Sequence, residues 1–388
     1  MSEHVVVDVL KAVGLFFLNP VWLVAIFAAV GLGYFRVKNE RRSFHVRLHP
    51  GLTELKRVIK ESWLPALLLS LVVSGVGLTV DVGWLVLLSA IAIVTMLTFY
   101  YQVASPIYAA ALAFFGLVAV QQFVGDVTVR GWSLTSIDFM GQIAITIPVI
   151  AGLLLIVEGF LVGTAAHYAS SFLTKTKRGL RAAAFKTKRL WLLPVIFLVP
   201  GDFLTAFTPY WPQFTVGATE FSFIPVPIVI GFSQVARASF ADDLLPKMGR
   251  AIIWIGVLVA AVGVLAWWMP IMGWVALVIG VVGRAALSIV VAVRERHGGF
   301  VGAPQSTGVM IAGILPDSPG EKLGLVPGEC IRTVNGIQVS NEKELYDAIQ
   351  VNAAHCRLQV IGRDGEVRLM QQVLYRHDHH RLGLLVVR

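Results

Sequence analysis

The sequence predicts an α-helical polytopic membrane domain with eight or nine transmembrane helices, followed by a small α+β domain at the C-terminal end. Two observations support this prediction. Hydrophobic residues make up 56% of the 388 residues and charged residues only 14%, whereas an ordinary soluble protein is about 25% charged. Long apolar runs fill the sequence up to about residue 293, and short alternating segments follow Gly298 and Gly299. The composition excludes a soluble enzyme, a disordered protein and a disulfide scaffold.

The apolar runs predict the membrane spans, because a helix needs about 20 apolar residues to cross a hydrocarbon core of about 30 Å. Residues 1–18 are also apolar in part, but Asp8, Lys11 and the break at Asn19-Pro20 indicate an interfacial helix. Whether this segment crosses the bilayer stays open, and we expect residues 19–293 to form the polytopic domain. The predicted spans lie near residues 19–35, 63–80, 84–103, 106–124, 141–162, 190–207, 221–237, 251–268 and 271–292.

The basic residues predict the orientation of these spans. Residues 300–388 carry nine Lys/Arg and nine Asp/Glu, so the whole net charge of +9 lies in the membrane part, and we set nucleic-acid binding aside. Residues 36–60 hold eight basic side chains and residues 164–189 hold seven. Since cytoplasmic loops are enriched in Lys and Arg, both segments are predicted to face the cytoplasm. Counting spans onward places the C-terminal domain there too.

Three ionisable residues, Glu158, Asp202 and Arg284, fall within or near predicted spans. Charge inside a membrane is costly and often marks an ion or substrate path. The simpler interpretation, which we favour, is that Asp202 ends a helix in water and that Glu158 and Arg284 pair or reach the interface.

Neither half contains a recognisable catalytic arrangement. There is no His-Glu-x-x-His zinc motif, no nucleophile with a base in reach within a span, and no glycine-rich phosphate loop. Cys330 and Cys356 match no zinc spacing and are predicted to be free thiols. His377–His380 form a cluster that we expect to shape a loop rather than to bind a metal. We therefore predict no enzyme activity, no cofactor and no metal site.

After a linker at 294–306, residues 307–388 predict a compact α+β domain. Val309–Leu315 reads as a strand, Ser318-Pro319 starts a short helix, and Asn335-Gly336 makes a tight hairpin turn. Ser340-Asn341 then caps a helix that runs to about Gln350. The remaining strands are predicted at Glu329–Val334, Arg357–Ile361, Glu366–Tyr375 and Leu382–Val387.

This region resembles a PDZ domain of the bacterial kind, on the segment Val309–Gly336, the helix after it and the turn Arg363-Asp364-Gly365. The resemblance implies a groove between a strand and the second helix, in which an extended peptide or a free C-terminus adds as a further strand. The family's hydrophobic-Gly-hydrophobic loop is matched by Leu382-Gly383-Leu384, which implies a circularly permuted order of elements. On this interpretation Leu385 lies along the groove strand, and Leu345 and Ile349 line the facing helix. The alternative is that Leu382–Val387 is simply a core strand.

The combination of a polytopic membrane region, one PDZ domain and the segment Asp-His-His-Arg-Leu-Gly-Leu-Leu (378–385) resembles the MinJ family of cell-division topological determinants in Gram-positive rods. That resemblance implies a non-enzymatic scaffold in the cytoplasmic membrane, enriched at the septum and poles, with the lipid bilayer around it. It would bridge a DivIVA-like polar scaffold to the MinC/MinD division inhibitor, and it could form homo-oligomers. Two alternatives stay open: an adaptor that presents substrates to a membrane protease, and a transporter with an accessory PDZ domain.

Overall fold

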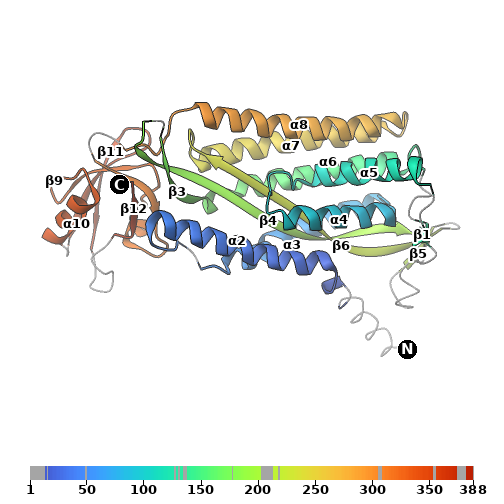
Figure 1. The fold of residues 1–388 in the computed structure, drawn as a ribbon, viewed down its shortest axis with the longest axis horizontal. Coiled ribbons are helices and arrows are strands. Elements are labelled where there is room, and N and C mark those ends of the chain that lie inside the picture. Colours follow the sequence, from blue (N-terminus) through green and yellow to red (C-terminus); the bar gives the residue numbers. More distant parts are fainter. Residues whose placement is uncertain are drawn as a thin grey trace.

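The computed structural model describes residues 14, 16–48, 50–125, 128–129, 132–133, 138–176, 178–201, 213–216, 219–304, 308–352, 355–373 and 382–387. Within these residues, helices surround a long β-hairpin, and a small mixed domain stands at one end (Figure 1). The predictions for Asp202 and for His377–His380 fall outside the described residues.

Six helices among the described residues are long and apolar enough to cross a membrane. The shorter α4, of 16 residues, is apolar as well and begins after Asp81, whose carboxylate accepts a hydrogen bond from the backbone N–H of Gly83. Within the described part of the membrane domain the α-helices are α2 (Pro20–Phe44), α3 (Thr53–Val76), α4 (Val82–Leu97), α5 (Pro106–Phe123), α6 (Ile143–Thr164), α7 (Ala241–Leu265) and α8 (Ile271–His297).

Helices α6 and α7 pack with their backbones almost in contact, because glycines face each other along the seam. A Cβ atom built on Gly159 would lie 2.5 Å from the carbonyl oxygen of Gly249, and one on Gly152 would lie 2.7 Å from that of Gly256. Small residues allow such close approach of helices in a membrane, where van der Waals packing replaces the hydrophobic effect as the driving force. The close contact between α6 and α7 holds these two helices together at the centre of the helical layer.

The predicted helical spans at 190–207 and 221–237 are wrong, because residues 190–200 of the first run and 221–236 of the second lie in β-strands. Together with two shorter strands they make an antiparallel sheet of order β3-β4-β6-β5, which lies among the helices (Figure 1). The two central strands pair over 16 residues, from Phe185↔Ala236 to Pro200↔Phe221. The strands are β3 (Ser170–Lys175), β4 (Arg181–Pro200), β5 (Gln213–Val216) and β6 (Thr219–Ala236), and a further short pair is β1 (Thr128–Val129) with β2 (Trp132–Ser133).

Prolines reduce the number of unpaired N–H groups on this hairpin, which lies among the helices. In the β4–β6 ladder Pro194 faces Pro227, and Ile196 faces Pro225. The N–H groups at these positions point away from the partner strand, as shown by Ile196, which donates outward to Ser70. Proline has no N–H, so each of the three prolines removes an outward donor that would otherwise need a partner.

Helix α3 accepts hydrogen bonds from two outward N–H groups along the edge of β4. The Ser62 hydroxyl accepts from the Leu192 N–H at 3.2 Å, and the Ser70 hydroxyl accepts from the Ile196 N–H at 3.0 Å. Further along, the Leu198 carbonyl accepts from the Val80 N–H. An unpaired backbone group costs several kcal/mol in hydrocarbon, so α3 is the element that makes a buried strand edge possible.

The C-terminal domain forms as the sequence predicts, around its own hydrophobic cluster. Its sheet has the order β11-β10-β8-β7-β12, with β9 paired to β8. Ser318 and Asn341 accept hydrogen bonds from the N–H groups of Glu321 and Glu344, as expected for helix caps. Its elements are β7 (Val309–Ile314), α9 (Pro319–Lys322), β8 (Cys330–Val334), β9 (Ile337–Gln338), α10 (Glu342–Val351), β10 (Cys356–Ile361), β11 (Val367–Gln372) and β12 (Leu384–Val386).

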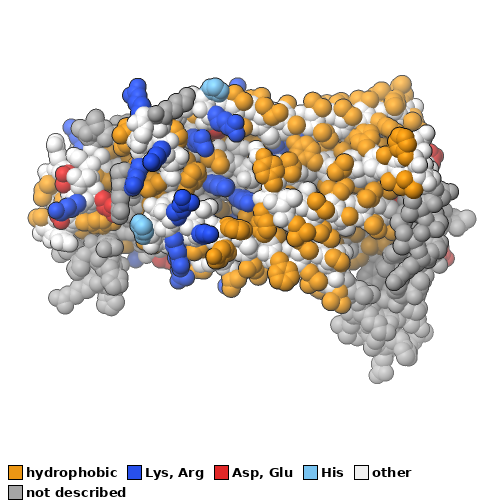
Figure 2. Space-filling model, in the orientation of Figure 1, with side chains coloured by type: hydrophobic (Ala, Val, Ile, Leu, Met, Phe, Trp, Pro, Cys, Tyr) orange, Lys and Arg blue, Asp and Glu red, His pale blue; other side chains and the backbone are white. Residues whose placement is uncertain are grey.

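The C-terminal domain sits at the end of the membrane domain where the basic segments gather. Figure 2 shows Lys and Arg side chains in a band between this domain and the apolar surface of the helices. Ala183 of β4 forms a bridge with Gly302, and the Gly298 backbone approaches Ala238 closely. The segments predicted to share one side of the membrane therefore lie at one end of the molecule.

Candidate functional site

The hydrophobic-Gly-hydrophobic loop at 382–384 is held by two backbone hydrogen bonds. The Leu382 carbonyl accepts from the Gly320 N–H at 2.9 Å, and the Gly383 carbonyl accepts from the Leu315 N–H at 2.8 Å. Gly383 has φ +72°, and a Cβ atom there would collide with Cβ of Ser318. Only glycine fits this turn without strain.

The same two hydrogen bonds set the direction of the loop's amides. In a trans peptide the N–H points opposite to the C=O of the same unit. Because the two carbonyls face α9 and β7, the N–H groups of Gly383 and Leu384 point away from them. Two successive N–H groups directed outward are what a peptide carboxylate or an extended backbone would use.

The predicted groove residues come together in part. Leu345 and Ile349 of α10 are fully buried and share one hydrophobic cluster with Leu382 and Leu384. Leu385 does not belong to that cluster, and its side chain lies beside Gly313. Strand β12 pairs with β7 through Leu384↔Ile314 and Leu385↔Gly313, and it ends the sheet order among the described residues. An end strand of this kind can accept a further strand.

Two buried thiols lie within the same domain. Burial raises the pKa of the Cys356 thiol to about 11 and also raises the pKa of Cys330. Neither cysteine takes part in a disulfide. Their environment is that of inert core residues rather than of nucleophiles.

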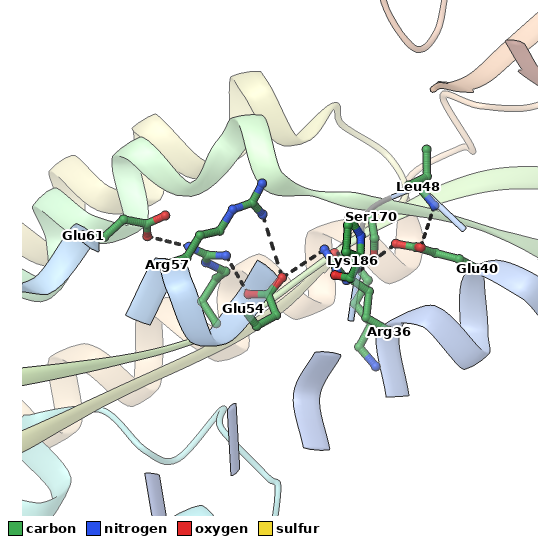
Figure 3. Close-up of polar contacts among 10 residues, drawn as sticks. Arg36, Glu40, Leu48, Glu54, Arg57, Glu61, Ser170 and Lys186 are labelled. Atoms are coloured by element: carbon green, nitrogen blue, oxygen red, sulfur yellow. Dashed lines mark hydrogen bonds and ion pairs between the residues drawn. The ribbon is translucent and has the colours of Figure 1, made fainter. Parts of the chain in front are cut away.

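A second polar site, which the sequence did not predict, joins α2, α3 and β4 (Figure 3). Glu54 accepts hydrogen bonds or ion pairs from Arg36 at 3.0 Å and from Arg189 at 2.8 Å. Arg189 also contacts Glu61, which accepts from the Trp191 indole N–H at 2.9 Å. The only sequence indication was the occurrence of Glu54 and Glu61 seven residues apart beside a basic segment. The cluster ties the hairpin to the two N-terminal helices.

The intramembrane pair expected at Glu158 and Arg284 is present. Arg284 donates to one oxygen of Glu158 from Nε at 3.0 Å and from Nη2 at 2.7 Å, and both side chains are buried. Ser105 donates to the other carboxylate oxygen, and Ser288 contacts the guanidinium. Such a closed set of partners is typical of a structural ion pair.

The membrane helices and the C-terminal domain together define a class: a polytopic membrane protein that carries a small α+β domain at its C-terminal end. A PDZ domain family model matches residues 310–361. Over its whole length the chain is 33% identical to the cell division topological determinant MinJ of Bacillus subtilis (strain 168), of which it covers 97%. The chain therefore belongs to the MinJ family of cell-division topological determinants.

Two further similarities define the extent of this relationship. The chain is 26% identical to the probable cell division topological determinant MinJ of Lacticaseibacillus paracasei, over 95% of this chain and 96% of that protein. It is also 31% identical to a probable periplasmic serine endoprotease DegP-like of Marinomonas sp. (strain MWYL1). That second match covers only 28% of this chain and 26% of the endoprotease. The full-length relatives are named for division topology and not for an enzyme activity.

Proposed function

We propose that this protein is a non-enzymatic scaffold of the cytoplasmic membrane that bridges a DivIVA-like polar scaffold to the MinC/MinD division inhibitor at the septum and poles. The observation that carries the proposal is the full-length similarity to a cell division topological determinant, combined with a PDZ domain fixed at one end of a membrane domain. The remaining geometry supports a recruiting role rather than a catalytic one.

The basic band supports a cytoplasmic position for the PDZ domain. Lys and Arg side chains of α2, of the β3–β4 hairpin and of the segment after β6 gather at the end that carries this domain (Figure 2). Positive charge at one membrane face marks the cytoplasmic side. MinC/MinD and a DivIVA-like scaffold would meet the protein on that side.

The groove at β12 supports binding of a peptide segment or of a partner's free C-terminus. On this proposal the Leu384 N–H faces the open edge of β12, and Gly383 with the buried side chains of Leu345, Ile349 and Leu382 forms the base on which the peptide lies between strand and helix. The Leu385 side chain lies beside Gly313 of the neighbouring strand β7. A partner strand added here would gain backbone hydrogen bonds from β12 and side-chain specificity from α10.

The transporter alternative loses its main support in the structure. Glu158 was one of the ionisable residues that could have marked an ion path, and its carboxylate is occupied by Arg284 and Ser105. A coupling-ion site would need a carboxylate open to an aqueous path.

The test is to image fluorescent fusions of three versions in dividing cells: the intact protein, Leu384→Pro and Leu384→Ala. Both substitutions remove the branched leucine side chain, but only proline also removes the outward N–H. We expect septal and polar enrichment of MinD with the intact protein and with Leu384→Ala, and dispersed MinD with Leu384→Pro. Normal MinD positioning in a strain whose protein is truncated after Arg296 would refute the bridging role.

A further inference from the structure

A basic pocket lies at the junction of α2, the β3–β4 hairpin and the end of β6. Its volume is about 790 Å³. The floor is the face of the sheet that carries Ser170 and Lys186, which are opposite each other in the β3–β4 register. The wall is formed by the last two turns of α2, with Asn39 and Ser43.

The lining is strongly positive. It contains Arg42, Lys175, Arg181, Lys186 and Arg237, together with His45 and a single acidic residue, Glu40. Glu40 already interacts with Arg36 and accepts from the Leu48 N–H at 2.9 Å. Among the residues that the structure describes, none of the five Lys and Arg side chains forms an ion pair with an acid. Five like charges around one cavity repel one another unless an anion enters it.

The apolar surface of α2 indicates the depth at which the pocket would meet a bilayer. Phe35, which is about half exposed, lies one helical turn before Asn39 on the same face of α2, so the pocket begins about 6 Å beyond it. The headgroup layer on each side of the hydrocarbon core is about 5–8 Å deep. Figure 2 shows the Lys and Arg band directly beside the apolar surface.

The pocket also continues toward that apolar surface. A smaller cavity of about 60 Å³ shares Asn39, Ser170 and Lys186 with it and reaches Leu32 and Phe35. The main pocket itself includes Phe172, Leu173 and Val235. A phosphate group on an apolar tail matches this combination of cations and apolar side chains better than a free phosphate or a phosphopeptide does.

We propose that this pocket binds the phosphate headgroup of an anionic phospholipid, such as a phosphatidylglycerol-type lipid of the leaflet that the PDZ domain faces. Lys186 and Arg237 hold the phosphate against the sheet, and Arg42, Lys175 and Arg181 supply charge around the rim. Basic pockets between membrane segments bind anionic headgroups in this way. The site is separate from the PDZ groove and does not depend on its ligand.

The test uses the full-length protein purified in detergent and measures thermal unfolding during titration with dioctanoyl phosphatidylglycerol. Parallel titrations use dioctanoyl phosphatidylcholine, inorganic phosphate and a phosphoserine peptide. We expect a saturable rise in unfolding temperature with phosphatidylglycerol only. An equal rise with inorganic phosphate or with the phosphopeptide would overturn the assignment to a lipid.

The pocket variant is Arg181→Gln/Lys186→Gln/Arg237→Gln, and its matched control is Lys56→Gln/Lys247→Gln/Arg250→Gln. The control removes the same charge from exposed residues that do not line the pocket. Each cation near an anionic surface contributes a factor of about five in affinity. We therefore expect affinity for phosphatidylglycerol to fall on the order of 100-fold in the pocket variant and to change little in the control.

A charge-conserving variant, Arg181→Lys/Lys186→Arg/Arg237→Lys, separates loss of binding from loss of folding. If the pocket variant lost lipid binding because it lacks positive charge, the charge-conserving variant should retain most of the rise in unfolding temperature with phosphatidylglycerol. Equal losses in the pocket variant and in the matched control would show general surface attraction and overturn the proposal.

Discussion

Glu158 and Arg284 show at the level of single residues how a membrane domain holds two charges in its core. Their side chains are 0% and 2% exposed and form a doubly hydrogen-bonded contact. The desolvation cost of such a pair is offset only while both partners are present. Loss of one partner therefore leaves a buried charge, whereas loss of both does not.

We expect Glu158→Leu or Arg284→Met alone to destabilise the protein by about 3–5 kcal/mol, and the double variant to recover most of that loss. Thermal unfolding in detergent, arranged as a double-mutant cycle, measures the coupling. Independent, additive effects of the two substitutions would contradict the pairing.

The two cysteines provide a reporter for the PDZ domain alone, because the sequence has only two and both lie in that domain. Burial raises the pKa of Cys356 from an ordinary value of 9.0 to about 11. At pH 8 we expect neither thiol of the folded protein to react with iodoacetamide, and both to react in denaturant. Rapid labelling of the native protein, followed by mass spectrometry, would show that the domain opens.

The same pKa shift of Cys356 predicts a pH dependence of stability. The unfolded thiol loses its proton near pH 9.0, whereas the folded thiol keeps it until about pH 11. The folded state therefore binds more protons in this window, and stability falls as the pH rises through it. We expect the denaturation midpoint of Cys356→Ala to decrease less between pH 9 and pH 11 than that of the unchanged protein. An equal decrease in both proteins would show that other groups cause the pH dependence.

At the level of elements, the hairpin of β4 and β6 shows what the sequence could and could not predict. Both strands are buried among helices, so they read as continuous apolar runs that periodicity alone does not distinguish from membrane helices. The overlooked indication was the spacing of the prolines. Pro225 and Pro227 are two residues apart, and Pro194 and Pro200 are six apart, which fits one edge of a strand and not a helix.

Elements with local signals were predicted well, whereas distant partners were not. Ser318, Asn341 and the Asn335-Gly336 turn fix their own segments through short-range hydrogen bonds, and the PDZ strands followed from them. Nothing in the sequence between Glu54 and Arg189 indicates that these residues meet, since 135 positions separate them. The sequence indicated the turn at Gly383, whereas the side on which Leu385 lies depends on the β12–β7 register, and the groove itself stays a prediction.

The serines of α3 make the role of that helix testable. Ser62→Ala and Ser70→Ala each leave an N–H of β4 without its acceptor, at Leu192 and Ile196. We expect each to lower stability by about 1–3 kcal/mol. Ser74→Ala, on the same helix, is the matched control and should be nearly neutral. Equal effects of all three substitutions in thermal unfolding would show that α3 does not support the strand edge.

At the scale of the whole molecule, the PDZ domain is anchored to the membrane domain rather than tethered to it. Met310, Ala312 and Val387 pack with Ala183 and neighbouring apolar side chains in a separate cluster. On the other side Arg363 contacts Asp242 at 3.3 Å and lies 3.9 Å from the Phe240 ring centroid. A fixed domain would present its groove in one orientation relative to the bilayer, which suits a scaffold that positions partners at a membrane.

A disulfide cross-link tests this anchoring in native membranes. A Cβ atom on Gly313 would lie 3.2 Å from the Ser171 hydroxyl, so Ser171→Cys/Gly313→Cys brings two sulfur atoms within bonding reach. Ser170→Cys/Gly313→Cys is the matched control, because alternation along β3 directs residue 170 to the opposite face. In a background without Cys330 and Cys356, we expect mild oxidation to link the first pair rapidly and the second slowly or not at all. Equal rates for the two pairs, measured by mobility on non-reducing gels, would mean that the PDZ domain moves freely over the basic end of the molecule, and the fixed orientation of its groove would have to be abandoned.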